Sequence, residues 1–295
     1  MEAPPDEHHT GGSIVTRTTG VAQEGARSLW YALWYAPGPM TPTTHGMNRW
    51  AGKTALVTGA SSGIGAAIAG RLVAEGMRVV GCGRRLDAVA DVLAAVDPTG
   101  TASLALACDV RDEAEVRGAF AAARDRFSGV DVLVNNAGLG HAGRLAEGSV
   151  DEWREMLEVN VLGLCICTRE ALADMRARGG PGQIIHIGSM AGQRVPAGAG
   201  LYAATKHAVR ALTESLRLEL REAGDPIRVG EICPGFVETG FAERYHKSAA
   251  KARETYGQFK VLEAADVAEA VVYMLACPEH VQVHDILLRP TAQPT

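Results

Sequence analysis

From Lys53 onward, the sequence predicts an α/β fold in which one doubly wound parallel sheet carries helices on both faces. Short apolar runs alternate with longer segments whose apolar residues recur at helical spacing. The runs are bounded by Gly, Asp or Pro, as buried strands are. In such sheets, ligands bind beyond the carboxyl ends of the strands. The seven expected strands are TALVTG, RVVGCG, LALACD, DVLVNNAG, QIIHIGS, IRVGEICPG and HDILLRP.

The first 46 residues differ from the rest, because they are rich in Pro, Gly and Thr. Their aromatic patch, residues 28–35, is too short to span a bilayer, and the acidic start lacks the basic region of a signal peptide. We predict a flexible N-terminal extension over residues 1–46, with Met47 as an alternative start, and a catalytic domain over residues 47–295. The aromatic patch could instead dock on a partner, and His8-His9 is interpreted as a solvated pair.

The composition excludes several classes of partner. With 47% apolar residues, 21% charged residues and a net charge of −5, the chain offers no basic surface to nucleic acid or to an anionic membrane. Its six cysteines have no C-x-x-C spacing, so we expect buried thiols in a reducing, cytoplasmic compartment and no metal site.

The first expected strand runs directly into a glycine-rich turn that opens a helix. Glycines permit a tight turn and let the backbone approach a pyrophosphate, whose charge is stabilised by the N–H groups of a helix N-terminus. The strand before the turn and the helix after it favour a dinucleotide site of the Rossmann type over a plain loop. The residues expected to contact the cofactor here are Gly59, Ser61, Ser62, Gly63, Ile64 and Gly65.

The end of the second expected strand predicts which dinucleotide is bound. A site for NAD usually has an acidic residue there, which binds the ribose 2′-hydroxyl. This strand ends instead in Arg84-Arg85, and Asp87 is expected to begin the next helix. Guanidinium groups suit a 2′-phosphate, so the sequence predicts NADP(H). The alternative is that both arginines are solvated surface charges.

A phenol and an ammonium are expected to share one helix face further along the chain. Tyr202 and Lys206 are four residues apart, which places them side by side on a helix. Ser189 precedes Tyr202 by 13 residues, at the end of an expected strand. A lysine so placed favours ionisation of the tyrosine, which indicates an oxidoreductase.

Together these motifs resemble the short-chain dehydrogenase/reductase family in order and spacing. The resemblance rests on Thr58-Gly-x-x-x-Gly63-x-Gly65, Asn135-Asn136-Ala137-Gly138, Asn160, Ser189, Tyr202-x-x-x-Lys206 and Pro234-Gly235, and it extends from about residue 50 to the C-terminus. It implies that Tyr202 donates a proton to a carbonyl oxygen, that Ser189 hydrogen-bonds this oxygen, and that Lys206 tunes Tyr202 and binds the nicotinamide ribose. Asn160 would hold a water that leads protons to the lysine.

The resemblance also implies further cofactor contacts. Asp109 would bind the adenine amino group, although it could instead cap the helix that starts near Asp112. Thr239 would bind the carboxamide, although a plain turn is the alternative. The remaining implied contacts are Val110, Asn136, Ala137, Gly138, Tyr202, Lys206, Pro234, Gly235 and Val237.

The substrate is predicted from the segments that should surround it. A lid over residues 241–259, with His141, Val195, Pro196 and Leu201, would form a mostly apolar pocket for a ketosteroid-like or xenobiotic ketone. His141 is interpreted as a pocket wall or as part of a solvated loop, and not as a base. A second hypothesis is a 3-hydroxy-acid, serine-type or other small-alcohol dehydrogenase, for which Arg194 and Arg244 are candidate carboxylate ligands. The third is a non-catalytic protein that senses NADP.

Association is also implied by the resemblance. Family members usually form tetramers through two long helices, here residues 153–178 and 202–223, and the C-terminal strand. We therefore expect a homo-oligomer, either a tetramer or a dimer.

Overall fold

The structure is a computed structural model that describes residues 46–294, so residues 1–45 of the predicted extension, including the aromatic patch and His8-His9, lie outside the described residues. Seven parallel strands form one sheet in the order β3-β2-β1-β4-β5-β6-β7. The strands are β1 (Thr54–Thr58), β2 (Arg78–Gly83), β3 (Ser103–Ala107), β4 (Val132–Asn135), β5 (Gly182–Ile187), β6 (Ile227–Pro234) and β7 (Asp285–Leu288). All seven predicted strands are confirmed, as is the doubly wound fold class.

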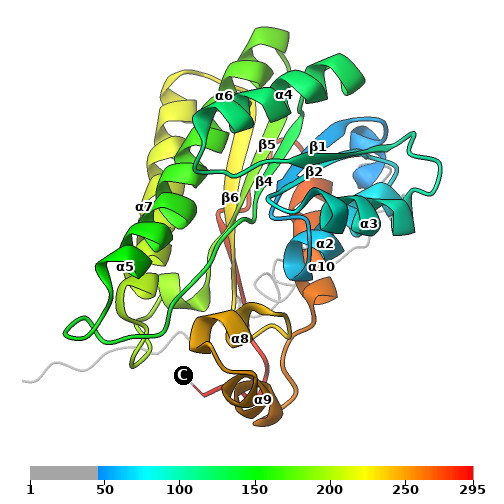
Figure 1. Ribbon diagram of the computed structural model, residues 1–295. Coiled ribbons are helices and arrows are strands. Elements are labelled where there is room, and N and C mark those ends of the chain that lie inside the picture. Colours follow the sequence, from blue (N-terminus) through cyan, green and yellow to red (C-terminus); the bar gives the residue numbers. More distant parts are fainter. Residues whose placement is uncertain (1–45, 295) are drawn as a thin grey trace, which may run out of the picture. The chain divides into compact units, whose positions relative to one another are not determined.

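Helices cover both faces of the sheet (Figure 1). One face carries α2 (Gly63–Ala74), α3 (Leu86–Val96) and α10 (Ala264–Ala276); the other carries α4 (Glu113–Phe127), α6 (Leu164–Arg178) and α7 (Gly200–Glu222). The remaining helices are a 3₁₀ turn (Met47–Trp50), α5 (Val150–Leu157), a π segment (Glu158–Gly163), a 3₁₀ turn (Met190–Gly192), α8 (Phe241–His246) and α9 (Ala249–Gly257). Each face of the sheet therefore has its own helical layer.

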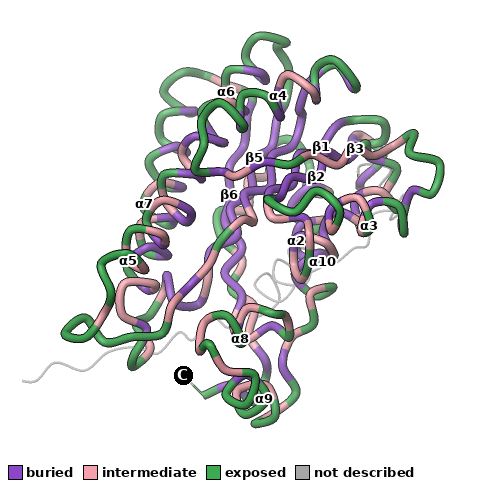
Figure 2. The backbone as a smooth tube through the Cα atoms, in the orientation of Figure 1, coloured by how far each residue is buried: buried purple, intermediate pink, exposed green. Residues whose placement is uncertain are grey.

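Neighbouring strand residues feed two separate cores, because successive side chains point to opposite faces. On β1, Val57 belongs to the core beneath α2 and α10, while Leu56 belongs to the core beneath α4 and α6. Both side chains are fully buried, and Figure 2 shows the central strands buried along their length. Burial on both faces explains why these strands read as continuous apolar runs and not as alternating ones.

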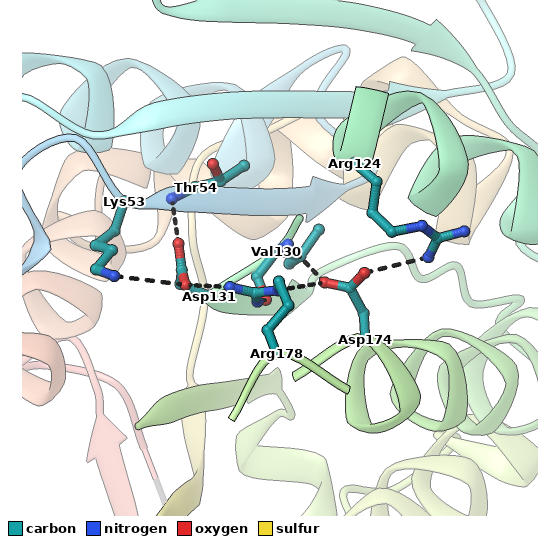
Figure 3. Close-up of polar contacts among 7 residues, drawn as sticks. All are labelled: Lys53, Thr54, Arg124, Val130, Asp131, Asp174 and Arg178. Atoms are coloured by element: carbon teal, nitrogen blue, oxygen red, sulfur yellow. Dashed lines mark hydrogen bonds and ion pairs between the residues drawn. The ribbon is translucent and has the colours of Figure 1, made fainter. Parts of the chain in front are cut away.

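Two buried carboxylates bind backbone N–H groups at the start of β1 and just before β4 (Figure 3). Asp131 accepts a hydrogen bond from the backbone N–H of Thr54 at 2.9 Å, and Asp174 accepts one from Val130 at 2.8 Å. Arg178 on α6 lies between the two carboxylates, with Nη1 2.8 Å from Asp131 and Nε 3.2 Å from Asp174. This network joins α6 to the edge of the sheet.

Two features complete the network. Arg124 on α4 donates to Asp174 at 3.1 Å, so this carboxylate, whose side chain is fully buried, has two guanidinium partners. Gly129, just before β4, has a left-handed φ of 115°, and a Cβ there would collide with Arg178. Only glycine fits this turn without strain.

Candidate active site

A cavity of about 1300 Å³ lies beyond the carboxyl ends of the strands. It spans the point between β1 and β4 where the strand order reverses, which is where doubly wound sheets bind ligands. The volume exceeds that of an ordinary small-ligand pocket, which fits a dinucleotide together with a substrate. The predicted site residues that line it are Gly59, Ser61, Ser62, Gly63, Ile64, Gly65, Arg84, Asp109, Val110, Asn136, Ala137, Gly138, Ser189, Tyr202, Lys206, Pro234, Gly235, Val237 and Thr239.

The glycine-rich turn is built so that the backbone is open to a ligand. Gly59 has a left-handed φ of 69°, and a Cβ on Gly65 would collide with the Gly59 carbonyl and with the Asn136 amide. Asn136 holds the turn by donating from Nδ2 to the Thr58 carbonyl at 2.9 Å. At the start of α2, the Ser62 side chain makes no capping bond. The N–H groups of this first turn are therefore available to an anion such as a pyrophosphate.

The two predicted arginines occupy different environments. Arg84 lines the cavity directly after β2, whereas Arg85 is the residue before α3 and does not line it. A Cβ on Gly83 would lie 3.7 Å from the Ser61 hydroxyl, so Ser61 faces the end of β2 next to Arg84. Within residues 46–294, neither guanidinium has a carboxylate within 4.0 Å. Arg84 and Ser61 together can bind a phosphate.

Asp109 does not cap the following helix, so that alternative is wrong. The helix begins at Glu113, and its cap is Asp112, which accepts from the N–H groups of Ala114 and Glu115. Hydrogen bonds from Arg111 hold the pKa of Asp109 below its usual value, and the shortest Arg111–Asp109 contact is 2.6 Å. Asp109 therefore reaches the cavity as a paired carboxylate.

Tyr202 and Lys206 lie on the cavity side of α7, as predicted. Lys206 is buried, and its Nζ donates to the carbonyl oxygen of Ile187 at 2.9 Å. Burial lowers the pKa of Lys206 to about 8, against the opposing influence of Glu231 and Cys233. A pKa of about 8 leaves the ammonium charged at neutral pH.

The Tyr202 phenol lies beside Ser189 at the wall of the cavity. Burial raises the pKa of Tyr202 to about 12, while a hydrogen bond with Ser189 acts in the opposite direction. Ser189 also accepts a hydrogen bond at Oγ from the backbone N–H of Ala191 at 3.0 Å, which fixes its side chain at the start of a 3₁₀ turn. The phenol is therefore protonated, as a proton donor must be.

Asn160 lies behind the cavity in the π segment that joins α5 to α6. Its amide binds both backbone groups of Leu139, accepting at 2.9 Å and donating at 2.7 Å, and also donates to Thr205 at 3.1 Å. A Cβ on Gly138 would lie 3.4 Å from Asn160 Oδ1 and 3.6 Å from Lys206 Nζ. Asn160 thus borders the same glycine as Lys206, although it does not line the cavity itself.

The segment predicted as a lid forms α8 and α9, which lie beyond the strand ends (Figure 1). The Tyr202 ring packs against Phe241 and Tyr245 of α8, with centroid distances of 5.5 and 5.8 Å. Thr239 accepts at Oγ1 from the Phe241 N–H at 3.2 Å, which is the plain turn named as an alternative. Its methyl group faces Gly63, so the same residue also closes the cavity over the glycine turn.

Most of the residues expected around a substrate line the cavity. Val195, Pro196 and His141 line the cavity, as do Arg194 and Arg244. Leu201 does not, because it precedes Tyr202 on α7 and a one-residue step turns its side chain away from the cavity side. His141 pairs with Glu155, Nε2 to Oε2 at 2.9 Å, and both residues line the wall.

Gln293 near the C-terminus is a cavity residue that the sequence analysis missed. Its Oε1 accepts from the Phe236 N–H at 3.1 Å, and its Nε2 lies 3.1 Å from Met190 Sδ. It thereby joins the segment after Pro234 to the segment after Ser189. A glutamine in a short tail has no local pattern that could have identified it.

The fold, the glycine turn and the Ser-Tyr-Lys arrangement define a nicotinamide-dependent dehydrogenase or reductase. A family model described as short chain dehydrogenase matches residues 53–250. The chain belongs to the short-chain dehydrogenase/reductase family, and the resemblance seen in its motifs is confirmed.

Similar proteins of this family cover nearly the whole of the described chain. Dehydrogenase/reductase SDR family member 11 of Bos taurus is 49% identical over 255 residues, 84% of this chain and 100% of that protein. Farnesol dehydrogenase of Aedes aegypti is 42% identical over 252 residues, 84% of this chain and 99% of that protein.

Similar solved structures include complexes with either nicotinamide cofactor. A closed form of serine dehydrogenase with NADP+ has a TM-score of 0.77 and 35% identity, covering 82% of this chain and 96% of that one. A short-chain dehydrogenase/reductase from Burkholderia phymatum with NAD has a TM-score of 0.73 and 31% identity, covering 81% and 89%.

Residues 46–294 lack two other kinds of feature. None of the helices between residues 46 and 294 has the length and apolar character needed to cross a membrane. The same part of the chain has no group of three or more His, Cys, Asp or Glu side chains placed to hold a metal ion.

Proposed function

We propose that the protein is an NADP(H)-dependent oxidoreductase that interconverts a carbonyl and a secondary alcohol. One observation carries this proposal: Ser189, Tyr202 and Lys206 meet on the wall of the cavity that also contains the open glycine turn. A protein that only sensed the cofactor would have no need of a proton donor beside it. The cavity thus combines a dinucleotide cradle with acid–base groups.

Each group has a separate task in the proposed reaction. A nicotinamide bound in the cavity would supply the hydride that reduces the carbonyl carbon, or would take it from the alcohol carbon in the reverse direction. Tyr202 gives its proton to the carbonyl oxygen, and the Ser189 hydroxyl hydrogen-bonds that oxygen as negative charge develops. The ammonium of Lys206 stabilises the phenolate that Tyr202 leaves behind. Asn160 positions the chain at Leu139 and Gly138 beside Lys206, where a water could join a proton path.

The preference for NADP(H) rests on Arg84 and Ser61. Both lie at the end of β2, where the adenosine ribose is bound in Rossmann folds, and the strand has no carboxylate there. An unpaired guanidinium and a hydroxyl favour a 2′-phosphate over a 2′-hydroxyl. In this scheme Asp109 and Val110 would hold the adenine, and Thr239 and Val237 would hold the nicotinamide.

An apolar substrate, such as a ketosteroid or xenobiotic ketone, suits the side chains that surround the proposed proton donor. Phe241, Tyr245, Val195 and Pro196 face the cavity near Tyr202. Burial of such apolar surface would be the main source of binding energy. The similarity to a farnesol dehydrogenase, whose name denotes an apolar alcohol, supports this class.

A small hydroxy acid is the second candidate substrate. Arg194 and Arg244 both line the cavity, and neither has an ion-pair partner among the side chains of residues 46–294. A guanidinium pair could bind a carboxylate. The similar structure of a serine dehydrogenase supports this alternative.

A substrate panel followed by NADPH absorbance tests the proposal. We expect apolar ketones to be reduced with the higher kcat/KM, and 3-oxo acids to be reduced poorly. Saturation by small carboxylates, abolished in an Arg194→Ala/Arg244→Ala variant, would favour the second candidate. Tight NADPH binding without reduction of any carbonyl would reject both and restore the sensor hypothesis.

We also propose a homo-oligomer, either a tetramer or a dimer. Exposed leucines follow the helices that the resemblance implies as interfaces: Leu157 at the end of α5, Leu162 in the π segment and Leu218 on α7. Light scattering on the purified protein tests this, and a monomer would contradict it. All six cysteines are free thiols, which supports a reducing, cytoplasmic location.

A further inference from the structure

A buried carboxylate lies close to the peptide that binds the lysine of the proposed active site. Glu231 stands on β6, is 2% exposed, and has an Oε1 atom with no hydrogen-bond partner in the described part of the chain. A buried carboxylate destabilises a fold unless a positive charge or hydrogen bonds compensate it. The surroundings of Glu231 therefore decide what it does.

The Glu231 carboxylate lies directly against Gly188. A Cβ on Gly188 would collide with Oε1 and would lie 3.0 Å from Glu231 Cγ. Gly188 follows Ile187, whose carbonyl accepts the hydrogen bond from Lys206 Nζ, and precedes Ser189. Glu231 thus borders the peptide that holds the Lys206 ammonium, and it does not itself line the cavity that Ser189 and Tyr202 line.

Charged and titratable groups face Glu231 from each neighbouring element. They are Lys206, Arg210 and Arg217 from α7, His186 from β5, Cys233 from β6 and Asp285 from β7. Most of them are engaged or exposed: Arg217 pairs with Glu214, Arg210 bonds Gln193, and Asp285 is exposed.

Lys206 differs from the buried Arg217 in having no carboxylate partner of its own among residues 46–294. Its Nζ has no carboxylate within 4.0 Å among residues 46–294, so the two charges act across the Ile187–Gly188 peptide and not through a contact ion pair. His186 is neutral, because burial and the charge of Lys206 lower its pKa to about 3. Burial raises the pKa of Glu231. A hydrogen bond with the Cys233 thiol and the charge of Lys206 act in the opposite direction and are smaller effects.

We propose that Glu231 is a positioning residue for the reaction: its buried carboxylate, placed behind the Ile187–Gly188 peptide, keeps the Lys206 ammonium charged so that this charge can act on Tyr202. The inference rests on the proposed function only for the role of Tyr202; the link between Glu231 and Lys206 is a property of the protein itself. Glu231 raises the pKa of Lys206, whereas burial lowers it. Without the carboxylate, only the smaller influence of Cys233 would oppose burial.

The pKa of Lys206 can be measured without turnover. The chain has only five lysines, Lys53, Lys206, Lys247, Lys251 and Lys260. Labelling their ε-carbons with ¹³C and titrating the full-length protein by NMR gives a separate curve for each, and Lys206→Met assigns one of them. In Glu231→Gln, we expect the Lys206 curve to move about one pH unit lower, a tenfold change in the dissociation constant.

Two variants serve as controls, and a third can replace the glutamine variant. Asp285→Asn removes the same charge at the position paired with Glu231 on β7, but at an exposed residue, and should leave Lys206 unmoved. Glu231→Asp keeps the charge and should retain most of the parental pKa. If the glutamine variant does not fold, Glu231→Ser removes the charge with a smaller side chain. A Lys206 curve that moves no more in the uncharged variants than in Asp285→Asn overturns the proposal.

A second readout connects the charge to the reaction. In reduction assays, the alkaline limb of kcat/KM should move to lower pH in Glu231→Gln by the same amount as the NMR curve. An unmoved limb beside a moved curve would refute the effect on Tyr202. If the parental protein reduced no carbonyl while the NMR shift appeared, the proposed function would fail and the link between Glu231 and Lys206 would stand.

Discussion

The two edges of the same sheet treat buried charge differently. At the N-terminal edge, Asp131 and Asp174 are each bonded to a backbone N–H and to arginine side chains (Figure 3). At the C-terminal edge, Lys206 has one carbonyl partner, and Glu231 keeps an oxygen without any. Full pairing stabilises a charge in one state, whereas incomplete pairing leaves its protonation open to change.

The backbone shows the same difference. At the N-terminal edge, strand ends are held by side chains from α6, which fixes the sheet to the helical layer. At the C-terminal edge, the start of α2 has no capping side chain and its glycine turn is open to the cavity. We therefore expect substitutions at the N-terminal edge to affect stability most and substitutions at the C-terminal edge to affect the proposed reaction most. Variants at the two edges should separate these properties.

The largest effect is expected at the proton donor. Tyr202→Phe should lower kcat about a thousandfold, or about 4 kcal/mol in the barrier, because the carbonyl oxygen loses its acid. The melting temperature and the affinity for NADPH, followed by its fluorescence, should stay near those of the parent. Turnover within tenfold of the parent would contradict the proposed mechanism.

The second effect is expected at the opposite edge, on stability alone. Asp174→Ala leaves Arg124 and Arg178 without their shared carboxylate and should lower the free energy of unfolding by about 3 kcal/mol. Urea unfolding measures this, and kcat should be unchanged under native conditions. Asp151→Ala, which removes an exposed ion pair with Arg154, is the matched control and should cost less than about 0.5 kcal/mol. Equal losses in the two variants would show that the buried network has no special weight.

A smaller effect is expected at the end of β2. Arg84→Ala should reduce the ratio of kcat/KM for NADPH over NADH about thirtyfold, or about 2 kcal/mol, since one charge-assisted phosphate bond is lost. Arg85→Ala removes the same charge one residue later, outside the cavity, and should leave the ratio within about threefold of the parent. A larger effect at Arg85 than at Arg84 would reverse the assignment of the phosphate site.

These arginines show how far the sequence alone can lead. The seven strands and the glycine turn were predicted correctly because Gly, Pro and Asp mark their ends and because buried strands are continuously apolar. Which arginine enters the cavity depends on where α3 begins. The helix starts at Leu86, which places Arg85 at its N-cap and leaves Arg84 at the strand end. A difference of one residue in a helix start cannot be predicted from propensity.

Contacts between distant parts of the chain were not predicted. The hydrogen bond between Phe236 and Gln293 joins residues 57 positions apart, and that between Asn160 and Leu139 depends on a π segment whose sequence is also compatible with an α-helix. In the sequence, Glu231 is a polar residue in a largely apolar strand. Its position against Gly188 arises only when β5 and β6 pair. Local patterns predict elements, whereas such positions come from packing.

The smallest expected effect is on the pH dependence of stability, to which the C-terminal edge should contribute through His186. His186, in the buried layer beneath Lys206, hydrogen-bonds Thr213 at 2.8 Å and has a pKa near 3, lowered first by burial and then by the charge of Lys206. Because this folded-state pKa is below the unfolded value of about 6.5, the unfolded chain binds the proton first as the pH falls. The loss of stability begins near pH 6.5, reaches about 1.4 kcal/mol at about pH 5.5, and continues down to the folded-state pKa.

His186→Asn should abolish that part of the acid lability, because asparagine does not titrate. Urea unfolding at about pH 7.5 and about pH 5.5 gives, for each protein, the stability lost between the two pH values. This loss should be about 1.4 kcal/mol smaller in the variant than in the parent. His207→Asn, at an exposed residue of α7, should keep the parental dependence. The N-terminal network of Asp131, Asp174, Arg124 and Arg178 contains no histidine. An acid lability of parental size that survives in His186→Asn would contradict its assignment to His186.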